Sequence, residues 1–361
     1  MRKLLYILTT LFLVTACTGD EIEPVVPIPN DECPIAFACI MENETNMQQG
    51  SGRSAIRRKA PTALAQNFKL WGYKTTATGT QSVFDGYNIE YKNGTAGTTE
   101  SNTHDYEYVG IENNGLSGGI QTIKYWDFGA SAYRFWGATG GTFNANGTTL
   151  TIPGLSLSTA EPTTPLFSAL YHRSPVSSEV VQLQFKRPYA KVRVMFYNSE
   201  ELTGDDQVLL TDISFGGGTG SIATSGQLVV TYPTTSTTTE TITQTNSATQ
   251  DALTFNGVTL DATHGTTSNN AVLAVPTGGT DWYYTLPLST AATAPAFTLN
   301  ATIDGEAKTA TIPTAYMQWK PNTSYTYIFK ISESGNKLDY GDVIIEPWLF
   351  GGSQDEEWHN W

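Results

Sequence analysis

VVQLQFKRPYAKVRVMFY, the stretch from residue 180 to residue 197, decides the fold class of this chain. From residue 181 to residue 186, valine, leucine and phenylalanine alternate with glutamine and lysine. After a break at Arg187 and Pro188, apolar side chains alternate with lysine, arginine and methionine up to Phe196. A period of two is typical of a strand that buries one face and leaves the other in water. The stretch therefore predicts two amphipathic strands.

Similar segments recur along the chain between clusters of turn-forming residues. We expect strands at residues 33–41, 67–75, 105–111, 132–139, 149–155, 271–276, 282–288, 296–303, 324–332 and 341–348. The chain has 33 glycines and 17 prolines, and stretches with a helical period are scarce. These features predict an all-β fold made of antiparallel β-sandwiches.

Residues 234–249, TTSTTTETITQTNSAT, are low in complexity and have two interpretations. Threonine favours strands, so the segment can form a strand pair. It can equally form a surface loop, and that second interpretation makes it a contact site. The sequence leaves both open.

The amino-terminal residues have the pattern of a lipoprotein signal peptide. Arg2 and Lys3 precede an apolar run that ends in small residues directly before Cys17. As a helix the run is about 20 Å long, shorter than the roughly 30 Å hydrocarbon core of a bilayer. We therefore expect residues 1–16 to be removed and Cys17 to carry the lipid that anchors the chain to a membrane leaflet.

The remaining chain is long enough for two domains of ordinary size. Residues 17–32 mix prolines with acids and predict an extended, lipidated linker. A boundary near residue 175, in HRSPVSS, divides the rest into an N-terminal β-sandwich domain at 33–175 and a C-terminal β-sandwich domain at 176–348. Residues 349–361 then form an acidic tail.

Two further cysteines, Cys33 and Cys39, lie six residues apart in one expected strand. Six steps of a strand separate their Cα atoms by roughly 20 Å, whereas a disulfide needs about 4.4 to 6.8 Å. We expect two free, buried thiols.

Motifs that indicate catalysis, metal binding or cofactor binding are missing from the sequence. The four histidines are isolated, and there is no paired Cys-x-x-Cys, no nucleophile elbow and no phosphate-binding loop. A net charge of −14 repels phosphate backbones, so nucleic acid is not an expected partner. The sequence predicts a protein that is not an enzyme and has no cofactor or metal. A lipid-anchored glycosidase is a third hypothesis, supported only by the number of acids.

Aromatic residues gather in KYWDFGASAYRFWG at residues 124–137. They can form a platform on which sugars stack. Amphipathic strands more often bury such rings in the core of a sandwich, and we favour the core interpretation.

Basic residues gather in GRSAIRRKAP at residues 52–61, between two expected strands. Such a stretch is usually a solvated loop. Loops rich in glycine and serine are also preferred sites of proteolysis. A cut here would separate the first strand and the lipid anchor from the rest of the chain.

Several segments, in matching order, resemble the fimbrillin-like lipoproteins, the subunits of type V pili. They are the lipid signal, FKLWGYK, KYWDFGASAYRFWGAT, VQLQFKRPYAKVRVMFY, QWKPNTSYTYIFKIS and VIIEPW. The resemblance covers almost the whole chain after the signal. It implies two tandem transthyretin-like β-sandwich domains and a structural role.

The resemblance also implies a route of assembly. An Arg-specific protease removes the lipidated N-terminal strand, and the C-terminal strand of a neighbouring subunit fills the groove that remains. In this sequence the cut would follow Arg53, Arg57 or Arg58. The donor would come from residues 337–361, with Val343, Ile344 and Ile345 as its apolar side chains. An uncut subunit would stay lipidated as a base anchor.

These features predict a structural subunit of cell-surface fimbriae, exposed at the outer membrane, with a role in adhesion. Its expected partners are other fimbrial subunits, the outer membrane through the lipid, and a host or bacterial surface receptor. The alternative hypothesis is a monomeric surface lipoprotein that binds a glycan or a host ligand, supported by the aromatic cluster and the Thr-rich segment.

Overall fold

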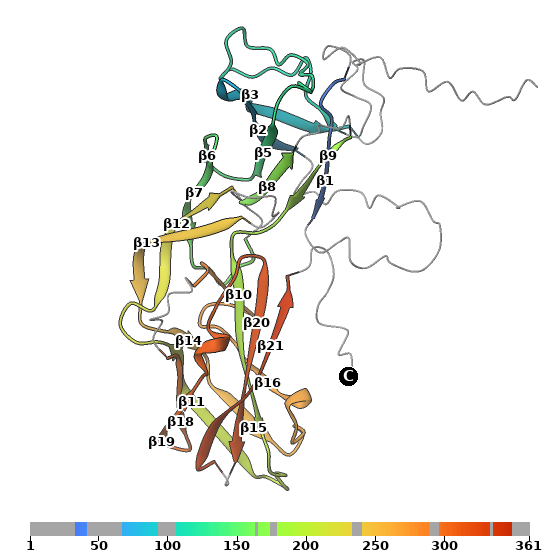
Figure 1. The fold of residues 1–361 in the computed structure, drawn as a ribbon. Helices are drawn as coiled ribbons and strands as arrows, with labels where there is room; N and C mark the ends of the chain where they lie inside the picture. Colours follow the sequence, from blue (N-terminus) through green and yellow to red (C-terminus); the bar gives the residue numbers. More distant parts are fainter. Residues whose placement is uncertain are drawn as a thin grey trace, which may run out of the picture.

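A computed structural model describes residues 33–41, 67–92, 106–162, 165–173, 179–232, 240–288, 296–332 and 335–348. Strands dominate these residues, and the helices among them are the short 3-10 turns η5 (Ser268–Asn270) and η6 (Thr314–Tyr316). No helix in this part of the chain is long and apolar enough to cross a membrane. The fold is all-β, as predicted (Figure 1).

The C-terminal part is a sandwich of two sheets around one core. The first sheet has the order β16-β10-β20-β21, with β17 also paired to β10, and the second has the order β14-β11-β18-β19, with β15 paired to β11. Inward side chains such as Val194, Phe215 and Tyr327 are fully buried between the sheets. The strands of this sandwich are β10 (Ala190–Asn198), β11 (Gln207–Gly216), β14 (Leu253–Phe255), β15 (Val258–Asp261), β16 (Val272–Ala274), β17 (Tyr283–Thr285), β18 (Thr298–Ile303), β19 (Glu306–Thr311), β20 (Thr323–Ser332) and β21 (Lys337–Pro347).

The N-terminal part is built on a sheet with the order β4-β3-β2-β5-β8. A separate two-stranded ladder of β1 and β9 covers one face of it, and aromatic rings fill the core between them. The strands are β1 (Phe37–Met41), β2 (Asn67–Thr76), β3 (Gly79–Tyr91), β4 (Tyr106–Glu107), β5 (Ala132–Thr139), β8 (Leu166–Arg173) and β9 (Val181–Phe185).

A third sheet joins the two halves of the sequence. Its order is β13-β12-β7-β6, made of β6 (Asn144–Ala145), β7 (Thr149–Ser156), β12 (Ile222–Thr231) and β13 (Thr241–Gln250). Its buried side chains share a core with Trp71 and Trp136 of the N-terminal sheet and with Trp348 near the end of the chain. Figure 1 shows it between the β2–β5 region and the β10–β20 region.

Strand pairing therefore crosses the division near residue 175. β7 comes from the first half of the sequence and pairs with β12 from the second. β9 follows residue 175, yet its inward side chains lie in the N-terminal core. The division into domains at 33–175 and 176–348 remains a prediction. Any such division must allow for strand pairs and core contacts that cross residue 175.

Most expected strands are present within one or two residues, but β1, β17 and β21 differ from the expected bounds by three or four residues at one end. Residues 105–111 are an exception, because only Tyr106–Glu107 forms a strand. The Glu107 carboxylate accepts the backbone N–H groups of Tyr108 and Val109 at 2.8 and 2.7 Å, which ends the ladder. Within the Thr-rich segment, residues 241–249 lie in β13, so the strand interpretation is correct for them.

Two strand pairs differ from the expected antiparallel arrangement. β1 pairs with β9 in parallel, and β10 pairs with β20 in parallel. Parallel neighbours need long crossover connections, so residues far apart in sequence meet in both pairs. The remaining ladders of the described residues are antiparallel.

Candidate functional site

The N-terminal segment at residues 33–39 lies in a groove whose walls come from much later in the chain. On one side, the backbone N–H of Ile35 donates to the carbonyl of Lys124 at 2.8 Å, and the N–H of Trp126 donates to the carbonyl of Cys33 at 2.9 Å. On the other side, the N–H of Val181 donates to the carbonyl of Ala36 at 2.8 Å. The parallel ladder with β9 then continues from Phe37 opposite Val181. Figure 1 shows β1, in blue, beside β9.

The side chains of this segment fill the N-terminal core. Ile35 and Phe37 are 0% and 1% exposed. The ring of Phe37 meets Phe84 and Phe135 edge to face, with centroids 5.4 and 5.6 Å apart. The hydroxyl of Tyr108 donates to the carbonyl of Ile35 at 2.9 Å, and burial raises the pKa of this tyrosine. At about 1.5 to 3 kcal/mol per buried side chain, Ile35 and Phe37 together contribute about 3 to 6 kcal/mol.

A glycine brings the wall and the floor of the groove close together. A Cβ atom at Gly137 of β5 would lie 2.8 Å from Cζ of Phe185 on β9, inside van der Waals contact. Because Gly137 has no side chain, the Phe185 ring of β9 can pack directly on β5. β9 is then free to pair with β1 along its edge. Gly137 is thus part of the reason why the groove has room for the N-terminal segment.

Cys33 and Cys39 form no disulfide, as predicted. Cys33 is buried in the N-terminal core, and Cys39 is half-buried with its sulfur against the hydroxyl of Tyr106. Both thiols belong to the segment that occupies the groove.

The donor-strand residues lie in the chain's own C-terminal sheet. Val343, Ile344 and Ile345 of β21 pair with residues 327, 326 and 325 of β20. β21 is last in the strand order, so among the described strands it pairs with β20 alone. Val343 packs on the core, whereas Ile345 is 47% exposed.

Trp348 fixes the end of the described chain. It is 2% exposed, and its backbone N–H donates to the carbonyl of Asn322 at 2.9 Å. The guanidinium of Arg187 lies over its ring at 4.2 Å from the centroid, and the ring of Tyr284 lies 5.3 Å away. Glu161 accepts a hydrogen bond from Arg187 at 2.8 Å. Burial lowers the pKa of Arg187 to about 10, and the carboxylate of Glu161 opposes this shift.

Several predicted site residues lie outside the described residues. They are Cys17 with the signal and linker, the candidate cleavage residues Arg53, Arg57 and Arg58, and the acidic tail 349–361. Their roles remain predictions.

The aromatic cluster is core, as favoured from the sequence. Trp126, Tyr133, Phe135 and Trp136 are all fully buried. Tyr133 is buried and therefore cannot stack on a sugar. Its hydroxyl accepts a hydrogen bond from the backbone N–H of Asp127 at 2.7 Å, and burial raises its pKa to about 12. The exceptions are Tyr125, which is half-buried, and Phe128, which is 37% exposed.

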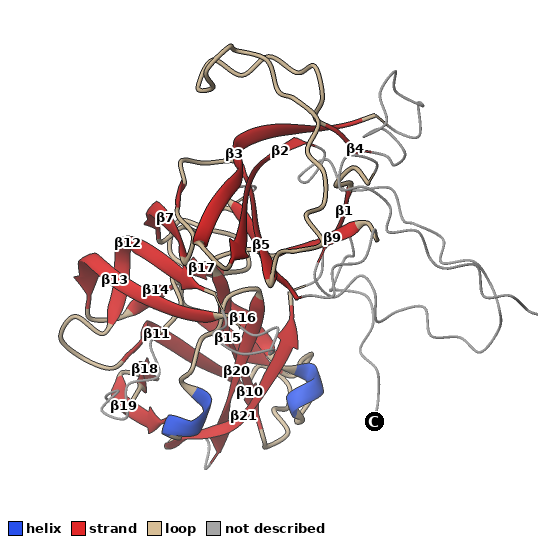
Figure 2. Ribbon diagram, turned by 45° about the horizontal axis from the view of Figure 1, so that its top comes forward, coloured by secondary structure: helices blue, strands red, loops and turns tan. Residues whose placement is uncertain are grey.

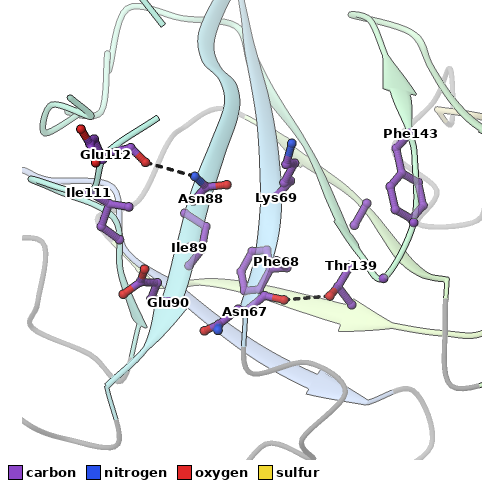
Figure 3. Close-up of a pocket in the computed structure, with 13 residues that line it drawn as sticks. Asn67, Phe68, Lys69, Asn88, Ile89, Glu90, Ile111, Glu112, Thr139 and Phe143 are labelled. Carbon is purple, nitrogen blue, oxygen red and sulfur yellow. Dashed lines mark hydrogen bonds between the residues drawn. The ribbon is translucent and has the colours of Figure 1, made fainter. Parts of the chain in front are cut away.

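A hollow that the sequence did not indicate lies on the outer face of the β3-β2-β5 sheet (Figure 3). Its volume is about 320 Å³. Lys69 and Asn88 face each other across its floor, the loop at Ile111 forms one wall, and Phe143 stands on the opposite side. Amide, ammonium and carboxylate side chains thus line the hollow together with the ring of Phe143. The strands supply its floor, but two loops distant in sequence supply its walls, so no local motif could reveal it.

No group of three or more histidine, cysteine or acidic side chains in the described ranges is arranged to hold a metal ion.

The model of the fimbrillin-like family matches residues 64–348, most of the chain. The chain belongs to the fimbrillin-like family. The match includes β21 and Trp348, and it begins after the basic stretch at residues 52–61. No curated protein matches this fimbrillin-like chain closely enough to count as a relative.

Solved structures of fimbrial proteins are similar to this fimbrillin-like chain at low identity. A fimbrial protein from Bacteroides vulgatus is 12% identical, with a TM-score of 0.45, over 88% of this chain and 99% of that one. The tip fimbrial protein Mfa3 from Porphyromonas gingivalis is 11% identical, with a TM-score of 0.34, over 78% and 94% of the two chains. A fimbrial assembly protein from Parabacteroides distasonis is 13% identical, with a TM-score of 0.30, over 80% and 95%.

Proposed function

We propose that this chain is a non-catalytic structural subunit of cell-surface fimbriae. It is exported as a lipoprotein, is anchored in the outer membrane through Cys17, and assembles with other fimbrial subunits after cleavage at Arg53, Arg57 or Arg58. Membership of the fimbrillin-like family and the lipoprotein pattern of residues 1–17 support this proposal.

The observation that carries the proposal is the position of residues 33–39. This segment occupies a groove formed by residues 124–126 and β9, and the chain connects it to β2 only through residues 42–66. All three candidate arginines lie in that connection. Cleavage there leaves the segment held by hydrogen bonds and apolar contacts alone, so the segment can be exchanged.

An empty groove would expose unpaired backbone groups and apolar side chains to water, which is energetically unfavourable. Departure of the segment unpairs the carbonyl of Lys124, the N–H of Trp126 and the N–H of Val181, and it uncovers the rings around Phe37. An extended segment from another subunit can restore both kinds of contact by β-augmentation. In this proposal that segment is β21 of a neighbour.

Two features make β21 a suitable donor. As an edge strand it is hydrogen-bonded to one neighbouring strand, and its exposed Ile345 is already available for a new contact. Its release would also uncover Leu338 and Val343, which pack on the C-terminal core. Its side chains alternate along one extended run, with Val343 and Ile345 on the same face of the strand.

Mass spectrometry of the protein shed from intact cells tests the proposal. We expect an amino terminus directly after Arg53, Arg57 or Arg58, together with polymers that resist mild dissociation. A variant with lysine at all three positions keeps the charge but removes the arginines, and it should remain lipidated and form no fibres. An acylated Cys17 as the sole terminus on assembled fibres would contradict the cleavage step.

A second function, binding of a polar surface ligand such as a glycan, is favoured by the hollow at Lys69. The buried Trp126 no longer supports it. Glycan-array binding that is lost in Lys69→Ala and Asn88→Ala, and kept in the exposed-loop variant Thr78→Ala, would support this role in adhesion. An array without any bound glycan would count against it.

A further inference from the structure

The sheet β13-β12-β7-β6 contains no charged side chain in any of its strands. Aspartate, glutamate, lysine and arginine make up 15% of the whole chain, so a sheet of this size would ordinarily carry several. Between Ile213 and Gln250 the one charged residue is Glu240, which pairs with Lys186. The sheet is therefore a neutral region on a protein with a net charge of −14.

The two faces of this sheet have different environments. Leu150, Ile152, Leu228 and Val230 point inward and are fully buried. The outward side chains form rows of threonine across the strands. One row contains Thr149, Thr231 and Thr241, and the next contains Thr151, Val229 and Thr243. Threonine rows are uncharged and pack well on a pleated surface.

The outer edge of the sheet is β13, a strand of 10 residues. β12 pairs with one side of β13, and no strand in the described part of the chain pairs with the other. Figures 1 and 2 both show β13 at the outer margin of the molecule. Most of its side chains are exposed, and it contains no proline, no glycine and no charge. Natural edge strands often carry prolines or charged side chains that prevent pairing with another chain, and β13 has neither. A bulge at Ser247 interrupts its ladder with β12, and residues 241–246 before it are in regular register.

The neutral composition favours one occupant, a second copy of this chain. Two copies with a charge of −14 each repel one another wherever acidic surfaces meet. A two-fold axis at β13 would place the strand antiparallel to itself, with each residue opposite a residue of the same strand. A charged residue on the axis would face its own copy, and one near the axis would lie close to it, so like charges would meet, which is destabilising. Because β13 is uncharged, it avoids both penalties.

We propose that β13 pairs edge to edge and antiparallel with β13 of a second copy of this chain. The pairing satisfies the free N–H and C=O groups of both strands and joins two neutral sheets into one continuous sheet. It is independent of the strand exchange proposed above, because β13 belongs to a different sheet from β1 and β21.

Sedimentation velocity over a range of protein concentrations tests the proposal on the full chain after export. We expect reversible dimers. Thr245→Lys near the middle of the strand, and separately Thr243→Lys, bring two lysines close together across the axis and should raise the dimer dissociation constant at least about tenfold. Thr311→Lys is the matched control, because Thr311 is an exposed threonine on β19, the edge strand of another sheet. The control should dimerise like the parent protein.

Disulfide cross-linking provides a second measurement. Under mild oxidation Thr245→Cys should form a covalent dimer, whereas Thr311→Cys should remain at the background set by Cys33 and Cys39 in the parent. Circular dichroism and melting curves verify that each variant is folded. A parent protein that is monomeric at every concentration would overturn the proposal. So would dimers unaffected by both lysine variants, or a monomer that uses this face to bind a neutral polysaccharide.

Discussion

Phe37→Ala tests whether the N-terminal segment is held by its side chains. Phe37 is 1% exposed and lies edge to face with Phe84, Tyr108 and Phe135. A phenylalanine buries about 150 to 250 Å², and truncation of a buried ring to alanine typically costs about 3 to 5 kcal/mol. We expect that loss in the free energy of unfolding of the intact chain.

The measurement is urea-induced unfolding followed by tryptophan fluorescence, since Trp126 lies in the same core as Phe37. A lower midpoint with an unchanged slope reports lost stability rather than a changed unfolded state. Ile120→Ala is the control, because Ile120 is 50% exposed and surface truncations usually change stability by about 0.5 kcal/mol or less.

The same substitution should also weaken the hold on a severed segment. In protein cut within residues 42–66, a loss of about 3 to 5 kcal/mol corresponds to dissociation that is about 10² to 10⁴ times more favourable. The released peptide can be measured by mass spectrometry after gel filtration. A loss below about 1 kcal/mol in the intact chain, with the peptide still retained after the cut, would refute the reasoning about the groove.

Three other predictions concern the cores. Tyr327→Phe removes the hydroxyl that accepts the indole N–H of Trp319 at 2.9 Å, so a buried donor loses its partner and thermal stability should fall by about 1 to 3 kcal/mol. Gly137→Ala places a methyl group against Phe185 and should cost about 1 to 3 kcal/mol in urea unfolding, whereas an unchanged midpoint would contradict the close packing. Burial raises the pKa of Tyr133 to about 12, so above the ordinary tyrosine value of about 10 the unfolded state loses a proton that the folded state keeps. Stability should therefore fall as the pH rises from about 10 to about 12, and urea midpoints of Tyr133→Phe should fall less steeply.

Regular alternation made several strands predictable. β5 is found at the expected residues 132–139, and β10 and β20 begin and end within one residue of expectation. β11 and β12 were not predicted, because bulges interrupt their alternation. In β11 the bulge includes Asp212 at a φ of 51°, and in β12 register shifts flank Gly226.

The site was less predictable than the strands. The sequence marked residues 33–41 as a strand and indicated their possible release, but it did not reveal which residues hold them. Phe37 pairs with Val181, which lies far from it in the sequence, and no local sequence pattern can indicate such a pair. The position of β21 illustrates the same difficulty, because its pattern predicts a strand but does not specify the sheet to which the strand belongs.

The third sheet has a consequence for the order in which the chain folds. β7 pairs with β12, and β12 also pairs with β13, so the complete sheet cannot form before residue 250 has been synthesised. Contacts of such long range form slowly. A shorter polypeptide that stops near residue 175 would also lack β9 and leave β1 without its partner strand. Folding of this protein is therefore an event of the whole chain, and a truncated amino-terminal half is a poor substitute for it in the laboratory.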